Sequence, residues 1–275
     1  MRIRIAHETH YRYDAPAKSA VQLLRLTPRN HEGQYVVGWR IEVSADCRLE
    51  PHEDAFGNLA HSFTVDGPLL ELSVRVEGEV ETQDTEGVVR GALERFPPSL
   101  YLRDTDLTKS DAAIAAYAEA AFAAAGGDAL ATMHGLQTGI YRDFIFDPDP
   151  THTGTSAIEA FAIKRGVCQD YAHVFIAAAR HLGVPARYIG GYFLRADGQV
   201  VQEAGHAWAE AFLPDLGWVA FDPANGICAT ASHVRVAVGL DYLGAAPIRG
   251  ARYGGGGEQL AVTVHVDQAS RQAQG

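Results

Sequence analysis

The sequence predicts an α+β fold, in which an N-terminal antiparallel β-sandwich precedes a core made of one cysteine-bearing helix packed on an antiparallel sheet. Two observations support this prediction. Residues 2 to about 82 consist of short segments with strand-like alternation, separated by turn residues, as in a sandwich. Residues 166–222 instead hold an apolar helical segment followed by three strand segments.

The N-terminal strands are expected to form a domain of their own over residues 1–84. A polar stretch at Gln83–Gly87 reads as a linker, and a second, catalytic domain is expected over residues 95–275. Because the first domain carries no recognisable catalytic group, we expect it to be a structural or oligomerising cap. The predicted strands are Arg2–Tyr13, Val21–Pro28, Tyr35–Ser44, Leu59–Val65 and Leu69–Glu81.

The second domain is expected to begin with helices that cover one face of its core. Helical spacing of apolar residues, with capping residues before them, predicts three helices. Near the C-terminus, the glycine-rich run 250–257 is expected to be a mobile loop and Gln259–Val266 a last strand. The predicted helices are Asp111–Ala125, Asp128–Asp143 and Ser156–Lys164.

Cys168 stands at the start of the longest buried helix that the sequence predicts. Apolar residues recur at three- and four-residue spacing from Ala172 to Leu182, and Gly183 and Pro185 then end the helix. The unpaired N–H groups of a first helical turn favour negative charge, and the thiolate is the reactive form of cysteine. The position therefore suits a nucleophile.

Two further residues complete a possible catalytic set. His206 begins the second of the three strand segments, and Asp222 ends the third, with turn residues between these two strands. A hairpin brings the start of one strand beside the end of the next, so His206 and Asp222 should be neighbours. Cysteine, histidine and carboxylate supply a nucleophile, its base and the group that orients the base.

Three sequence blocks around these residues resemble the transglutaminase-like (papain-like) superfamily: GVCQDYAH (166–173), GHAWAE (205–210) and GWVAFDPANG (217–226). The match is to its bacterial branch, which carries a β-rich N-terminal domain. The opening IAHETHYRYDAPAKSAVQLLRLTPR and the closing GLDYLGAAPIRGARYGGGG also look like that branch, so the resemblance covers nearly the whole chain. This chain has Leu240 where the branch usually has arginine, and no role is carried over to that position.

The resemblance and the residues together imply acyl transfer from an amide without a cofactor. His206 would take the proton of Cys168, giving a thiolate–imidazolium pair, and Asp222 would orient the imidazolium. The acyl-enzyme would be resolved by water, as in a protease or amidase acting on a peptide or isopeptide bond, or by an amine, as in a transglutaminase. The expected partner is a peptide or protein substrate. The sequence identifies neither the amide nor a side-chain donor to the oxyanion.

Three other residues are candidates for substrate binding or support of the site. Asp170 lies in the first turn of the helix, where its carboxylate could cap the helix or contact substrate, and we expect it to face solvent. Tyr171 follows it, and Trp208 lies two residues after the histidine and is expected to pack behind the site.

Two alternative readings use the same residues. A metal site could take Cys168, His206 and Asp222 as ligands, but zinc sites usually show paired short spacings, which this sequence lacks, so we expect no metal. An inactive transglutaminase-like module could serve as a binding scaffold, yet a scaffold has no need of all three residues.

Composition limits the remaining possibilities. The formal net charge of −11, without a cluster of Lys and Arg among aromatic residues, argues against a nucleic-acid partner. Cys47, Cys168 and Cys228 are widely spaced, which favours a reducing compartment over a disulfide framework. We find neither a signal peptide nor an apolar run of membrane-spanning length, so a soluble, cytoplasmic protein is expected. The sequence does not indicate an oligomeric state.

Overall fold

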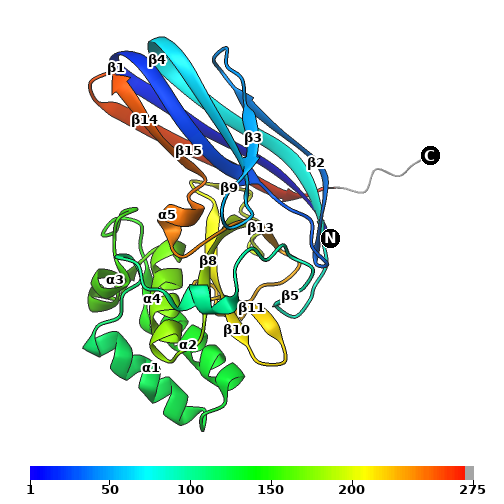
Figure 1. Ribbon diagram of the computed structural model, residues 1–275, viewed down its shortest axis with the longest axis vertical. Helices are drawn as coiled ribbons and strands as arrows, with labels where there is room; N and C mark the ends of the chain where they lie inside the picture. The colour runs from blue at the N-terminus through cyan, green and yellow to red at the C-terminus, as the bar shows by residue number, and fades with distance from the viewer. Residues whose placement is uncertain (270–275) are drawn as a thin grey trace, which may run out of the picture.

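The computed structural model describes residues 1–269 and confirms the α+β fold with mostly antiparallel sheets. A large sheet lies at the top of Figure 1 and packs against the second half of the molecule. In that half, helices α1–α4 lie beside a smaller sheet. No helix among the described residues combines the length and apolar character needed to cross a bilayer.

The large sheet is built around two long strands that the sequence had divided into shorter ones. β1 and β4 pair antiparallel along most of their length, with an irregularity between Arg12 and Ala17 where the chain passes through Asp14 and Pro16. Side chains on one face of this sheet enclose an apolar core of their own. The strands are β1 (Arg2–Thr27), β2 (Gln34–Val43), β3 (Glu50–Glu53), β4 (Leu59–Thr82), β9 (Val201–Gln202), β14 (Ile248–Gly254) and β15 (Glu258–Gln268).

The C-terminal strands belong to the large sheet, so the segment 95–275 that was expected as the second domain contributes strands to both sheets. β15 pairs with residues Ile3–Tyr13 of β1, and β14 pairs with residues Ala17–Leu24 of the same strand. The chain therefore leaves the first sheet, forms the second half and returns. Residues 270–275 of the expected second domain lie outside the described residues.

The smaller sheet carries the predicted hairpin. Its strands run in the order β12-β11-β10-β8-β13, with β5 paired to β11. Ala209 lies opposite Phe221, so the first residue of β10 and the last of β11 meet at one end of the hairpin, as predicted. The strands are β5 (Val88–Val89), β8 (Ala186–Phe193), β10 (His206–Leu213), β11 (Gly217–Asp222), β12 (Ile227–Cys228) and β13 (His233–Gly239).

The α4 helix is buried between the smaller sheet and the other helices. Its residues from Gln169 to Arg180 are all buried, which is expected of a helix that is covered on every side. α1, α2 and α3 contact it on one side, and β8 and β10 on the other. The helices are η1 (Pro98–Leu102, a 3₁₀ turn), α1 (Ala112–Ala124), α2 (Ala129–Asp143), α3 (Ala157–Ile163), α4 (Cys168–His181) and α5 (Tyr242–Ala245), and the short strands β6 (Ile145–Phe146) and β7 (Arg165–Gly166) pair just before α4.

Candidate active site

Cys168 is the first residue of α4, as predicted, and its local fold depends on a glycine. The Asp170 carboxylate turns back and accepts a hydrogen bond from the Val167 backbone N–H at 2.8 Å, which fixes the start of the helix. A Cβ on Gly166 would lie 2.3 Å from Oδ2 of Asp170, so no other residue leaves room for this contact. The turn holds the thiol at the positive end of a 14-residue helix.

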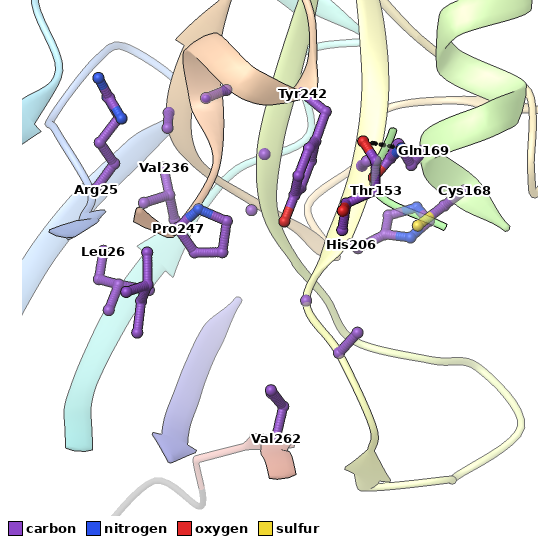
Figure 2. Close-up of a pocket in the computed structure, with 18 of the residues that line it drawn as sticks. Arg25, Leu26, Thr153, Cys168, Gln169, His206, Val236, Tyr242, Pro247 and Val262 are labelled. Atoms are coloured by element: carbon purple, nitrogen blue, oxygen red, sulfur yellow. Dashed lines mark hydrogen bonds between the residues drawn. The ribbon is translucent and has the colours of Figure 1, made fainter. Parts of the chain in front are cut away.

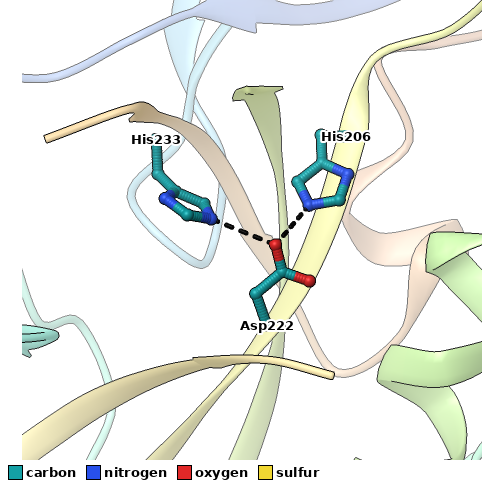
Figure 3. Close-up of side chains that lie close together, drawn as sticks. All are labelled: His206, Asp222 and His233. Carbon is teal, nitrogen blue, oxygen red and sulfur yellow. Dashed lines mark hydrogen bonds and ion pairs between the residues drawn. The ribbon is translucent and has the colours of Figure 1, made fainter. Parts of the chain in front are cut away.

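The hairpin brings His206 and Asp222 together. Nε2 of His206 lies 2.7 Å from Oδ2 of Asp222, and the carboxylate is fully buried. Figure 3 shows the two side chains converging from neighbouring strands. Because Nε2 is engaged by the carboxylate, Nδ1 is the ring nitrogen left for Cys168, whose side chain lies in the same cavity.

Asp222 is held by more hydrogen bonds than the sequence predicted. Its Oδ2 also accepts from Nδ2 of Asn225 at 2.6 Å and lies 3.1 Å from Nε2 of His233, while Oδ1 accepts from the backbone N–H groups of Ala224 and Asn225. A carboxylate with this many donors is fixed in position and stays ionised.

His233 reaches Asp222 as a neutral donor. Its Nδ1 accepts a hydrogen bond from the Thr230 backbone N–H at 3.0 Å, so the ring proton is on Nε2, which donates to Asp222. Burial lowers the pKa of His233, which keeps the ring neutral. Neither His233 nor Asn225 was singled out from the sequence. The only available signal was the position of Asn225 within the DPANG block.

The charges of the site favour an imidazolium at His206. Burial alone would lower the pKa of His206, but the Asp222 carboxylate, followed by the hydrogen bond and charge of Cys168, outweighs burial and raises it. Burial opposes ionisation of Asp222 as well, yet His206 and His233 hold the pKa of Asp222 well below its usual range. A protonated histidine between a carboxylate and a thiol is the arrangement expected of an activated cysteine.

The supporting residues occupy structural positions, and one expectation, that Asp170 faces solvent, is wrong. Asp170 is buried instead of facing solvent, caps α4 and accepts a hydrogen bond from Thr151, and burial raises its pKa. Tyr171 packs against Phe144 and lies outside the lining of the cavity. Trp208 also lies outside that lining and packs behind the two histidines, at 6.0 Å from the His206 ring. Tyr171 and Trp208 therefore support the site without forming its surface.

The structure brings together a different set of possible metal ligands from the set that the sequence suggested. The ligand atoms of His206, Asp222 and His233 lie within 4.8 Å of one another, and Cys168 is outside this group. Each histidine nitrogen in the group already makes a hydrogen bond to the same carboxylate oxygen. The arrangement is therefore that of a hydrogen-bonded cluster around the Asp222 carboxylate.

Cys168 and His206 open into a cavity of about 340 Å³ between the two sheets (Figure 2). β1 and β15 of the large sheet line one side, and α4, β8 and the α5–β14 segment line the others. The expectation that the N-terminal part is only a cap is therefore incomplete, because its sheet forms a wall of the site. Tyr188 also lines the cavity, and burial, followed by the charge of Cys168, raises its pKa well above the usual value.

Comparison with known proteins identifies the family. Models of the bacterial transglutaminase-like N-terminal region and of the transglutaminase-like superfamily match residues 3–81 and 117–223. An uncharacterised protein of Mycobacterium leprae is 30% identical over 96% of this chain and 98% of its own length. A Pseudomonas aeruginosa protein-glutamine gamma-glutamyltransferase is 30% identical, across 44% of this chain and 20% of that protein.

The fold also matches a solved structure. The crystal structure of a proposed cysteine protease from Cytophaga hutchinsonii aligns with a TM-score of 0.77 over 99% of this chain and 92% of that one, at 19% sequence identity. The fold is thus shared with a known structure along nearly the whole chain. The chain belongs to the transglutaminase-like superfamily, with the bacterial transglutaminase-like N-terminal region preceding its core.

Proposed function

We propose that this protein is a cysteine-dependent enzyme that hydrolyses a peptide or isopeptide bond through Cys168, His206 and Asp222. The observation that carries the proposal is the 2.7 Å contact between His206 and a buried carboxylate, beside a cysteine at a helix N-terminus. The superfamily is one of cysteine-based enzymes, which supports the same chemistry.

The reaction follows from the positions of the groups. The proton of the Cys168 thiol resides on Nδ1 of His206, and the sulfur attacks the amide carbonyl carbon to give a tetrahedral intermediate. His206 then donates this proton to the nitrogen as the C–N bond breaks, and the amine leaves. Water, deprotonated by His206, attacks the thioester and releases the acid and the free thiol. An amine in place of water would give transfer, the alternative that the match to a glutamyltransferase favours.

Two groups are placed to stabilise the oxyanion. The backbone N–H of Cys168 is one of the unpaired donors at the helix start. The Tyr188 hydroxyl is the second candidate, because it lines the same cavity and its raised pKa keeps it protonated as a donor.

Tyr188→Phe is expected to reduce kcat by roughly 10²–10³-fold, the effect of losing one oxyanion donor, with a smaller change in KM. Tyr192→Phe is the matched control, since Tyr192 lies four residues later on the same strand and its hydroxyl is bonded to Nδ1 of His7 at 3.0 Å. Steady-state kinetics on both variants provides the measurement. Equal losses in the two variants would remove Tyr188 from the mechanism.

The rate at which Cys168 is alkylated distinguishes an active enzyme from an inactive scaffold. With iodoacetamide at pH 6, Cys168 is expected to label at least about tenfold faster than Cys47 or Cys228, because only Cys168 has a histidine that accepts its proton. Peptide mass spectrometry over time gives the three rates in one sample. Labelling of Cys168 at the rate of the other two cysteines would favour the scaffold.

A further inference from the structure

The cavity beside Cys168 extends well past the reacting groups. Figure 2 shows Cys168 and His206 at one end, Tyr242 along the middle, and Leu26 and Pro247 toward the other end. Its volume of about 340 Å³ lies within the usual range of small-molecule sites, about 300–1,000 Å³. The space is therefore larger than the amide group itself requires.

The far part of the cavity is apolar, and its side chains come from both halves of the molecule. No Asp or Glu is among the residues that line the cavity within 1–269. The apolar lining residues away from the thiol are Leu26, Val236, Ala237, Ala245, Pro247, Ile248, Leu260 and Val262.

The titratable side chains in this part are already paired with other protein groups, although Nη1 of Arg25 is buried without a hydrogen-bond partner among the described residues. His7 bonds to Tyr192 and to Thr9 through its two ring nitrogens, and burial lowers its pKa to about 4, so it is neutral near pH 7. Nε of Arg25 is paired with Oδ2 of Asp54 at 2.7 Å. Because Asp54 already balances the charge of Arg25, an ionised ligand group in this space would lose its water without gaining an uncompensated partner of opposite charge.

Gly190 lets the cavity reach the backbone of β8. It lies between Tyr188 and Tyr192, which also line the cavity. A Cβ on Gly190 would have one close neighbour, the Ala245 carbonyl oxygen at 3.3 Å, and would otherwise meet open space. A Cβ here therefore requires a shift of a few tenths of an ångström, and because Gly190 lines the cavity, a side chain would take up cavity volume.

We infer that this cavity binds an uncharged, apolar group of the acyl donor, and that the sheet carrying Leu26 and Val262 helps to set this specificity. That the bound group belongs to an acyl donor rests on the proposed function. That the group is uncharged and apolar rests on the composition and continuity of the cavity. It assigns the N-terminal half a part in substrate selection.

The test uses alkylation, which requires the thiol and the cavity but no turnover. Cys168 is labelled with N-hexyl chloroacetamide and with N-(5-hydroxypentyl) chloroacetamide, two neutral probes of equal length. Each methylene buried contributes about 0.8 kcal/mol, or about fourfold, and a buried hydroxyl without a partner adds a penalty. We expect the hexyl probe to label Cys168 at least about tenfold faster, while both probes label Cys47 at equal rates.

Gly190→Val is expected to lower the hexyl-to-hydroxypentyl rate ratio at Cys168 by about tenfold, because the new side chain takes up the apolar space. Gly38→Val is the matched control: it is also a strand glycine, a Cβ there would meet nothing within 4 Å, and it does not line this cavity. Circular dichroism checks the fold of each variant. Should Gly190→Val fail to fold, the nearly isosteric Val262→Thr is expected to lower the ratio by placing a hydroxyl in the lining.

Equal labelling of Cys168 by the two probes would overturn the inference. An unchanged ratio in a folded Gly190→Val protein, or in Val262→Thr when Gly190→Val does not fold, would also overturn it. A probe preference without hydrolysis of any amide would instead contradict the proposed function and leave the apolar site standing.

Discussion

Cys168→Ala is expected to abolish hydrolysis of any amide substrate, by roughly 10⁶-fold in kcat, as loss of the nucleophile does in triad enzymes. The change should leave the fold intact. Cys168 is only partly buried at the first position of α4, and alanine is a favourable helix residue, so the free energy of unfolding should change by about 1 kcal/mol or less.

The measurement pairs steady-state kinetics with chemical denaturation of the wild type and the variant. Cys47→Ala, which alters a thiol in the N-terminal part, is the control and should keep full activity. A Cys168→Ala protein that retains near-wild-type turnover would end the mechanism proposed above.

Asp222→Asn is expected to lower kcat by up to ~10⁴-fold, the loss seen when a triad aspartate is replaced by asparagine. The carboxylate holds His206 through Oδ2, which also accepts from His233 and Asn225. An amide presents one acceptor oxygen and two N–H donors, so part of this network loses its acceptor and the imidazolium loses its counter-charge. The free energy of unfolding should also fall, by about 1–3 kcal/mol.

Asp215→Asn provides the control for this change. Asp215 lies in the turn of the same hairpin, is exposed and has a positive φ of 67°, a conformation that asparagine tolerates well. Its activity and stability should match the wild type. If Asp222→Asn has an unaffected rate, then Asp222 is only a turn residue and His206 acts without it.

The three central residues could be predicted because each stands at the end of an element with a clear local pattern. Cys168 precedes a helical apolar repeat, while His206 and Asp222 bound two strands joined by a short turn. Local periodicity and the geometry of a hairpin were sufficient to bring the histidine and the aspartate together. The signals that predict a helix beginning at Cys168 are local as well.

The features of the site and of the fold that the sequence did not predict depend on contacts between distant parts of the chain. His233 reaches Asp222 from β13, a strand beyond the hairpin, and its hydrogen bond has no signature in local spacing. The pairing of β15 with β1 joins residues more than 200 positions apart, and the alternation of β15 fits either sheet. The run 250–257 was predicted as a loop from its glycines, yet its first five residues extend β14 because β1 offers them a paired edge.

The cavity was not predictable for the same reason. Its walls come from β1 and β15 on one side and from β8 and α4 on the other, so it exists only once the two halves are packed together. The expectation of a cap without chemistry treated the N-terminal strands in isolation. Their apolar residues looked like ordinary core, and Leu26 and Val262 became part of the site through tertiary packing.

The pH dependence of Cys168 alkylation, compared between the wild type and His206→Ala, tests the central claim most directly. If the thiol and the imidazole share a proton, with the pKa of His206 raised by Asp222 and Cys168, the wild-type rate should level off at or below neutral pH. His206→Ala should move that plateau to higher pH. A wild-type rate that rises with a single midpoint near 8.5, the ordinary value for a free thiol, and that is unchanged in His206→Ala would contradict the account.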